Sequence, residues 1–77
     1  MDSSKKLVEE KLIYTMPEVA KILGTNEAYV QNLRKAGLIR CLQLGRYKVR
    51  REELIRFLRD NEGMDLRDPY HVKPISD

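Results

Sequence analysis

Hydrophobic residues recur at helical spacing in two neighbouring stretches in the first half of the chain. The first stretch has one apolar face, with residues at i, i+3, i+4 and i+7: Met16, Val19, Ala20 and Leu23. Thr15 precedes this face, and Glu18 follows Thr15 by three residues, which is the spacing of a capping box. Pro17 is tolerated in a first helical turn, and Gly24 can end a helix in the left-handed conformation. The pattern therefore predicts a helix between Thr15 and Gly24.

The second stretch predicts another helix, which ends at Gly37. Asn26 is a favoured N-cap residue for it, and Thr25 is an alternative. Val30 and Leu33 form a narrow apolar face, so we expect most of this helix to face solvent or a ligand. The residues on that outward side are Glu27, Ala28, Tyr29, Gln31, Asn32, Arg34 and Lys35. Two helices joined by a tight glycine turn indicate a helix-turn-helix unit.

Polar and apolar residues then alternate over positions 42–49, on both sides of Gly45-Arg46. A two-residue connection with glycine first is typical of a type II′ hairpin turn. In that register, four apolar residues pair across the turn and share the face that packs on the helices: Leu42, Leu44, Tyr47 and Val49. Gln43 and Lys48 are expected to share the other face, with Arg46 at the tip.

The flanking segments predict one more helix and one more strand. The third helix follows Arg50-Arg51, and its apolar set is Leu54, Phe57 and Leu58. Glu52 and Glu53 fall in its first turn, where the helix dipole stabilises carboxylates, and we prefer this interpretation to a catalytic pair. The segment Leu7–Tyr14 is either a short helix or a stretch that ends in a strand at Leu12–Tyr14. We favour the strand, which would add to the hairpin.

Positive charge is concentrated in the middle of the chain, although the formal net charge is only +3. Residues 31–59 contain nine Lys or Arg and two Glu, a net charge of +7, whereas 1–30 and 60–77 are mildly acidic. A basic block of this kind is typical of proteins that bind polyanions. From charge alone, a solvated charged face is an equally good interpretation. The helix pair and the hairpin favour polyanion binding.

Composition argues against other kinds of site. Cys41 and His71 are the only residues of their types, too few for a zinc site within one chain. A Cys–His nucleophile pair is disfavoured because the two residues fall in a strand entry and a predicted tail. The four glycines are isolated, so there is no Gly-rich phosphate loop. We therefore expect no enzymatic activity, metal or cofactor, and, with one cysteine and no long apolar run, a cytoplasmic protein without a membrane span.

The outward side of the second helix carries residue types that read DNA bases. Asn and Gln can pair with adenine and Arg with guanine, and residues near the start of a recognition helix usually reach base edges. The candidates for base contact are Glu27, Ala28, Tyr29, Gln31 and Asn32. Glu27 has the alternative role of stabilising the helix dipole, and Tyr29 that of a partly buried residue. Arg34 and Lys35 lie further along the helix and are expected at phosphates.

The hairpin supplies a second set of candidates. Arg46 at the tip suits the minor groove, whose negative potential attracts arginine. The full set of wing candidates is Gly45, Arg46, Tyr47, Lys48 and Arg50. We interpret Arg56 and Arg59 of the third helix as ordinary solvated charges.

These elements predict an α+β fold: a small winged helix-turn-helix with three helices and a two- or three-stranded antiparallel wing. Seventy-seven residues are enough for one domain. We expect residues 1–11 to form a flexible N-terminal segment, residues 12–63 a winged-helix DNA-binding domain and residues 64–77 an extended C-terminal tail.

The run from Tyr14 to Leu58 resembles the excisionase-type DNA-binding family, a small winged-helix relative of the MerR-like (mercury-resistance-regulator) domains. The matching features are E-x-A-x-x-L-G at Glu18–Gly24 and x-V-x-x-L-x-x-x-G-L/I at Tyr29–Ile39. A looser match to G-R-x-x-x-[IV]-x-x-x-x-L-x-x-[FW]-L runs from Gly45 to Leu58. The chain departs from the family at Asn26-Glu27-Ala28, where members often carry arginines.

The resemblance implies a recognition helix in the major groove and a wing in the minor groove. It also implies a recombination directionality factor, which binds beside an attachment site, bends DNA and helps a tyrosine recombinase (integrase) to excise a mobile element. The short chain favours this role over the alternative of a small MerR-like transcriptional regulator. An alternative of another class is a protein-interaction module whose basic face binds an acidic partner.

The expected partners are therefore double-stranded DNA, a tyrosine recombinase and further copies of the chain that associate cooperatively on DNA. The segment Asp65–Asp77 is either a contact for the recombinase or a disordered end.

Overall fold

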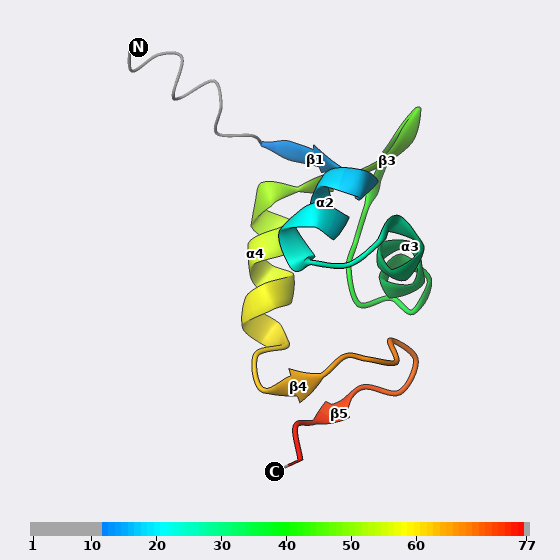
Figure 1. The fold of residues 1–77 in the computed structure, drawn as a ribbon. Helices are drawn as coiled ribbons and strands as arrows, with labels where there is room; N and C mark the ends of the chain where they lie inside the picture. Colours follow the sequence, from blue (N-terminus) through cyan, green and yellow to red (C-terminus); the bar gives the residue numbers. More distant parts are fainter. Residues whose placement is uncertain (1–11, 77) are drawn as a thin grey trace.

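The computed structural model describes residues 12–76, in which three helices and two small antiparallel sheets follow one another along the chain (Figure 1). The elements are β1 (Ile13–Thr15), α2 (Met16–Leu23), α3 (Glu27–Lys35), β2 (Leu42–Leu44), β3 (Arg46–Arg50), α4 (Arg51–Asp60), β4 (Met64–Asp65) and β5 (Lys73–Pro74). The expected N-terminal segment 1–11 lies outside the described residues. The architecture is the α+β winged helix-turn-helix that the sequence predicts, with a three-stranded wing sheet.

The predicted cap residues hold the two helices of the helix-turn-helix. The Thr15 hydroxyl accepts from the Glu18 N–H at 3.2 Å, and the Glu18 carboxylate accepts from the Thr15 N–H at 2.8 Å, which completes the capping box. Gly24 ends α2 with φ of 74°, a left-handed conformation that only glycine adopts readily. Asn26 caps α3, since its Oδ1 accepts from the Tyr29 N–H at 2.8 Å.

A single apolar core lies between the helices and the wing sheet. Its members are Met16, Val19, Ala20, Val30, Leu33, Ile39, Val49, Leu54 and Phe57. Leu58 was expected in this core, but its side chain is 47% exposed. Leu54 and Phe57 turn the narrow apolar stripe of α4 inward, and Leu58 lies one step round the helix from that stripe. Packing of these nine residues thus fixes α3 and β3 against the same core.

The sheet has the order β1-β3-β2, so the strand predicted before α2 does join the wing. β1 covers Ile13–Thr15 and pairs antiparallel with β3, with Tyr14 opposite Val49. Val49 is fully buried, which fixes the face that β3 turns toward the core. The wing is therefore anchored at its root by a third strand.

The predicted register of the β2–β3 hairpin is wrong by one residue. Leu42 lies opposite Lys48 and Leu44 opposite Arg46, so Gly45 stands between the strands with φ of 77°. Since a slip of one residue moves a side chain to the other face of a strand, Leu42 and Leu44 are exposed.

The two polar residues expected to share a face are also separated by this shift. Gln43 pairs with Tyr47, whereas Lys48 pairs with Leu42 and Thr15. The pairing of β1 with β3 and the burial of Val49 fix β3, and the left-handed glycine lets β2 return in the shifted register.

The segment 64–77, expected to be an extended tail, contains a second hairpin over its described part. β4 and β5 pair antiparallel, with Met64 opposite Pro74 and Asp65 opposite Lys73. Leu66 packs against the core, and Pro69 in the connecting loop is buried. The sequence did not indicate this hairpin, because strands of two residues are too short to show an alternation of polar and apolar positions. Figure 1 shows this hairpin below α3 and α4, at the opposite end from the wing.

Candidate nucleic-acid interface

The first turn of α3 is held by its cap and exposes Glu27 and Ala28 to solvent. Val30 and Leu33 are fully buried and set the orientation of the helix. Among the predicted contact residues of α3, Glu27, Ala28 and Lys35 are exposed, whereas Tyr29, Gln31, Asn32 and Arg34 are half-buried. The expectation that most of this helix faces outward is therefore confirmed for three residues and holds in part for the other four.

An open hollow brings one flank of α3 together with the wing. It is lined by Thr15, Met16, Pro17, Glu27, Gln31, Arg46, Tyr47 and Lys48. Two of these residues come from the first two turns of α3 and three from β3, and all five are sequence-predicted contact residues. The start of α2 forms the third wall, which the sequence reasoning did not include. The remaining predicted residues, Ala28, Asn32, Arg34, Lys35, Tyr29, Gly45 and Arg50, lie outside this lining.

Arg34 joins α3 to the wing. Its guanidinium carbon lies 4.0 Å from the centroid of the Tyr47 ring, a cation–π contact. Its Nε donates to Oε1 of Gln31 at 3.0 Å. The residue that the sequence placed at a phosphate is thus packed between the two parts of the predicted DNA-binding face. No local signal indicated this contact, because Tyr47 reaches Arg34 only through the tertiary fold.

Tyr29 lies on the other flank of α3 and contacts the C-terminal hairpin. Its hydroxyl donates a hydrogen bond to the backbone carbonyl oxygen of Leu66. Burial raises the pKa of this phenol, and the nearby carboxylates of Asp65 and Asp68 raise it further. The interpretation of Tyr29 as a partly buried residue is confirmed.

The wing is open to solvent at its tip and partly covered in the middle of β3. Gly45 and Arg46 are exposed, whereas Lys48 is half-buried. Arg50 is exposed at the far end of β3, where it lies 3.4 Å from the Glu52 carboxylate and precedes α4. The cations of the wing therefore follow β3 from its tip to its root.

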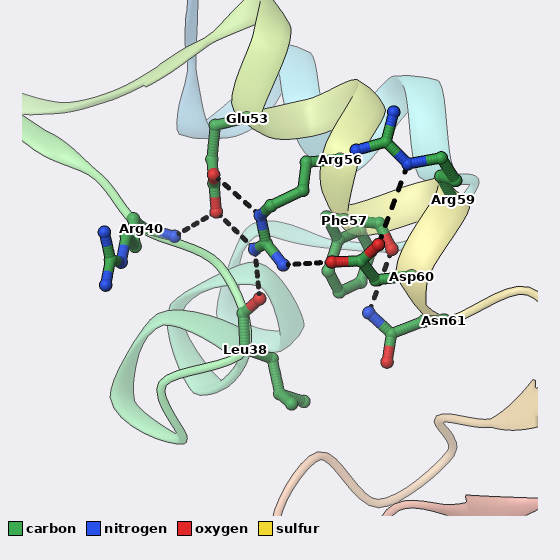
Figure 2. Close-up of polar contacts among 8 residues, drawn as sticks. All are labelled: Leu38, Arg40, Glu53, Arg56, Phe57, Arg59, Asp60 and Asn61. Carbon is green, nitrogen blue, oxygen red and sulfur yellow. Dashed lines mark hydrogen bonds and ion pairs between the residues drawn. The ribbon is translucent and has the colours of Figure 1, made fainter.

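Polar contacts from α4 hold the segment that joins α3 to β2, as Figure 2 shows. The Glu53 carboxylate accepts from the Arg40 backbone N–H at 2.8 Å and from Arg56 Nε at 2.9 Å. Arg56 also donates to the Leu38 carbonyl oxygen and to Asp60 Oδ2, each at 3.0 Å. The hydrogen bond from Arg56 lowers the pKa of Glu53, and the Arg40 N–H lowers it further against the opposing effect of burial.

The expectation that Arg56 is an ordinary solvated charge is therefore wrong. Arg56 is half-buried and connects two helical carboxylates to the backbone of a preceding loop. The Arg59 side chain, by contrast, is 69% exposed, and its ion pair with Asp60 is long, at 3.7 Å. The difference arises because positions 53, 56 and 60 lie on the side of α4 that faces Leu38–Arg40, a relation between segments that spacing within one helix does not show.

Cys41 and His71, the two residues considered for other kinds of site, do not line the hollow. No group of three or more His, Cys, Asp or Glu within residues 12–76 is arranged to hold a metal ion. Burial raises the pKa of the Cys41 thiol, and His71 is an exposed residue 2.9 Å from Asp68. Over the same range, no helix has the length and apolarity needed to cross a membrane.

The fold and this face define a DNA-binding helix-turn-helix protein. The family model described as a helix-turn-helix domain matches residues 13–62, well over half of the chain, and the chain belongs to that family. The match runs from β1 to just beyond α4, so it contains both the hollow and the Glu53–Arg56 contacts. No curated protein and no solved structure matches the chain.

Proposed function

We propose that α3 enters the major groove of double-stranded DNA while the β2–β3 wing contacts the adjacent backbone and minor groove. The observation that carries this proposal is the shared hollow, because Gln31 of α3 and Arg46 of the wing line it together. A duplex that contacts one of these elements therefore meets the other. The net charge of +7 over residues 31–59 supports a polyanionic ligand.

We divide the predicted contacts by their placement. Residues near the start of a recognition helix reach base edges, and exposed cations further away reach phosphates. The proposed base contacts are Glu27, Ala28, Gln31 and Asn32, and the proposed backbone contacts are Lys35, Arg46, Lys48 and Arg50. Tyr29 and Arg34 support this surface, since the side chain of each is held by another part of the protein.

We further propose that the chain is an excisionase-type recombination directionality factor, which bends DNA to promote integrase-mediated excision of a mobile element. The residue pattern from Tyr14 to Leu58 supports this role. A single module of this size buries a small interface on DNA, so useful occupancy requires several adjacent copies or a partner protein. Cooperative binding to tandem sites and a bent product are the expected properties.

The test begins with selection of bound sequences from a random duplex library. Fluorescence anisotropy then compares one selected site with three tandem copies at two salt concentrations, and circular-permutation gel shifts measure bending. Steeper filling of the tandem sites and a bent complex are expected. Independent filling without a bend would contradict the directionality role and favour the transcriptional regulator. If the chain binds no DNA at either salt concentration, the alternative of a protein-interaction module for an acidic partner is favoured instead.

A further inference from the structure

One side chain of the recognition helix is already oriented by a neighbour. Gln31 lines the hollow between α3 and the wing, and its Oε1 accepts a hydrogen bond from Arg34 Nε at 3.0 Å. Among residues 12–76 we find no hydrogen-bond acceptor for the Nε2 group of Gln31. One of the two lone pairs of the amide oxygen is therefore taken within the protein, and both protons of the NH2 group are left for a ligand.

Arg34 is itself fixed, and the wing fixes it. The guanidinium lies over the Tyr47 ring at 4.0 Å, and Tyr47 also lines the hollow. A guanidinium held by a cation–π contact on one side and an amide oxygen on the other has little rotational freedom. The wing is thus connected to the recognition helix through two successive contacts: Tyr47 of β3 holds Arg34 of α3, and Arg34 holds Gln31.

The orientation of a glutamine amide decides which purine it can read. A bidentate pair with adenine needs the amide oxygen to accept from N6 while the NH2 group donates to N7. Guanine instead presents two acceptors, O6 and N7, on the same edge. The hydrogen bond from Arg34 fixes the direction of the oxygen and uses half of its acceptor capacity, so the amide presents chiefly its NH2 group and matches guanine better than adenine.

We propose that Arg34 is a positioning residue that presents the Gln31 NH2 group to DNA, so that Gln31 selects guanine over adenine at one position of the target. This inference rests on the proposed function, because it requires α3 in the major groove. It assigns Arg34 a role in base selection through another residue, in place of the phosphate contact expected from the sequence.

The experiment compares base preferences rather than overall affinity. Bound sequences are selected from a random duplex library with the wild-type chain and with Gln31→Ala, and the position that loses its preference in Gln31→Ala is the Gln31 position. Selection is repeated with Arg34→Met, which keeps a long unbranched side chain but removes the guanidinium. It is also repeated with Gln31→Glu, which keeps the acceptor for Arg34 but removes the NH2 donors. Arg59→Met is the matched control, because it removes the same charge from an exposed position on α4, outside the hollow. Circular dichroism melts check that each variant is folded.

We expect the wild-type chain and Arg59→Met to prefer guanine over adenine at the Gln31 position by about fivefold or more. Gln31→Glu should lose this preference, and Arg34→Met should lose it or shift it toward adenine while preferences at other positions remain. An unchanged guanine preference in folded Arg34→Met, or a wild-type preference for adenine, would overturn the inference and leave the proposed function intact. A wild-type chain that enriches no sequence would overturn both.

Discussion

Arg56 of α4 donates a 3.0 Å hydrogen bond from Nη2 to the backbone carbonyl oxygen of Leu38, in the segment between α3 and β2. Its partner Glu53 accepts from the backbone N–H of Arg40 in the same segment. A connecting segment outside helices and ladders needs partners of this kind for its backbone groups. The third helix therefore fixes the point at which the chain leaves the recognition helix and enters the wing.

Replacement of Arg56 should destabilise the fold more than replacement of a neighbouring arginine on the same helix. Arg56→Met leaves the Leu38 carbonyl oxygen without this donor and the Glu53 carboxylate with the Arg40 N–H alone, and we expect a loss of about 1–3 kcal/mol in the free energy of unfolding. Arg59→Met removes an exposed ion pair and should cost less than about 1 kcal/mol. Urea denaturation followed by circular dichroism measures both. Equal losses would show that the Arg56 contacts do not stabilise the fold.

Glu53 should make stability depend on acidic pH. Its pKa in the folded chain is below the ordinary value of 4.5 because Arg56 and the Arg40 N–H stabilise the carboxylate. The stabilisation is therefore complete above the unfolded pKa and is lost as the pH falls through the lower folded pKa. Thermal melts between neutral and strongly acidic pH should show a smaller acid-dependent decrease for Glu53→Gln than for the wild-type chain. Because hydrogen bonds from Arg67 also lower the pKa of Asp65, some acid dependence should remain in the variant, and identical pH profiles would contradict the prediction.

Loss of the Tyr29 hydroxyl should release the C-terminal hairpin from the recognition helix. Tyr29→Phe keeps the ring but leaves the Leu66 carbonyl oxygen without its donor, which we expect to cost about 1 kcal/mol. Amide hydrogen exchange should become faster in residues 64–74, with little change in α2. Tyr70→Phe is the control, since Tyr70 is 53% exposed in the loop of that hairpin. The same exchange pattern in both variants would exclude a specific role for the Tyr29 hydroxyl.

Arg46 at the exposed wing tip should contribute to DNA binding through charge. Arg46→Ala should weaken binding and reduce the slope of log affinity against log salt by about one unit if the side chain contacts one phosphate. Arg59→Ala removes the same charge from α4, outside the hollow, and should change the slope less. Fluorescence anisotropy titrations at four salt concentrations measure the slopes. Equal slopes for Arg46→Ala and the wild-type chain would remove Arg46 from the interface.

Local signals were sufficient to predict the helices. Helix ends depend on residues within one turn of each other, so the neighbouring sequence determines where each helix begins and ends. Examples are the caps at Thr15 and Asn26 and the stop at Gly24. The buried faces of α2 and α3 follow from the same short-range periodicity. The strand before α2 was predictable only as a preference, because three residues carry little alternation.

Contacts between distant segments were not predictable in this way. The β2–β3 register depends on burial of Val49 and on pairing with β1, and a symmetrical alternation around Gly45-Arg46 hid that constraint. Five predicted contact residues do meet in one hollow, because α3 and β3 were correctly assigned as elements. The contact of Arg34 with Tyr47 joins two such elements, and neither residue carries a local sign of the other.

The pairing of β1 with β3 closes the chain on itself around both helices of the helix-turn-helix unit. The helices and the β2–β3 hairpin form from neighbours in sequence, whereas this closure carries the entropic cost of a long loop. We expect β1 to join after the folding transition state. Tyr14→Ala, at the centre of β1, should then accelerate unfolding and leave the refolding rate nearly unchanged in stopped-flow chevron plots. Because β1 holds β3 at the root of the wing, separation of β1 from β3 would also uncouple the recognition helix from the wing.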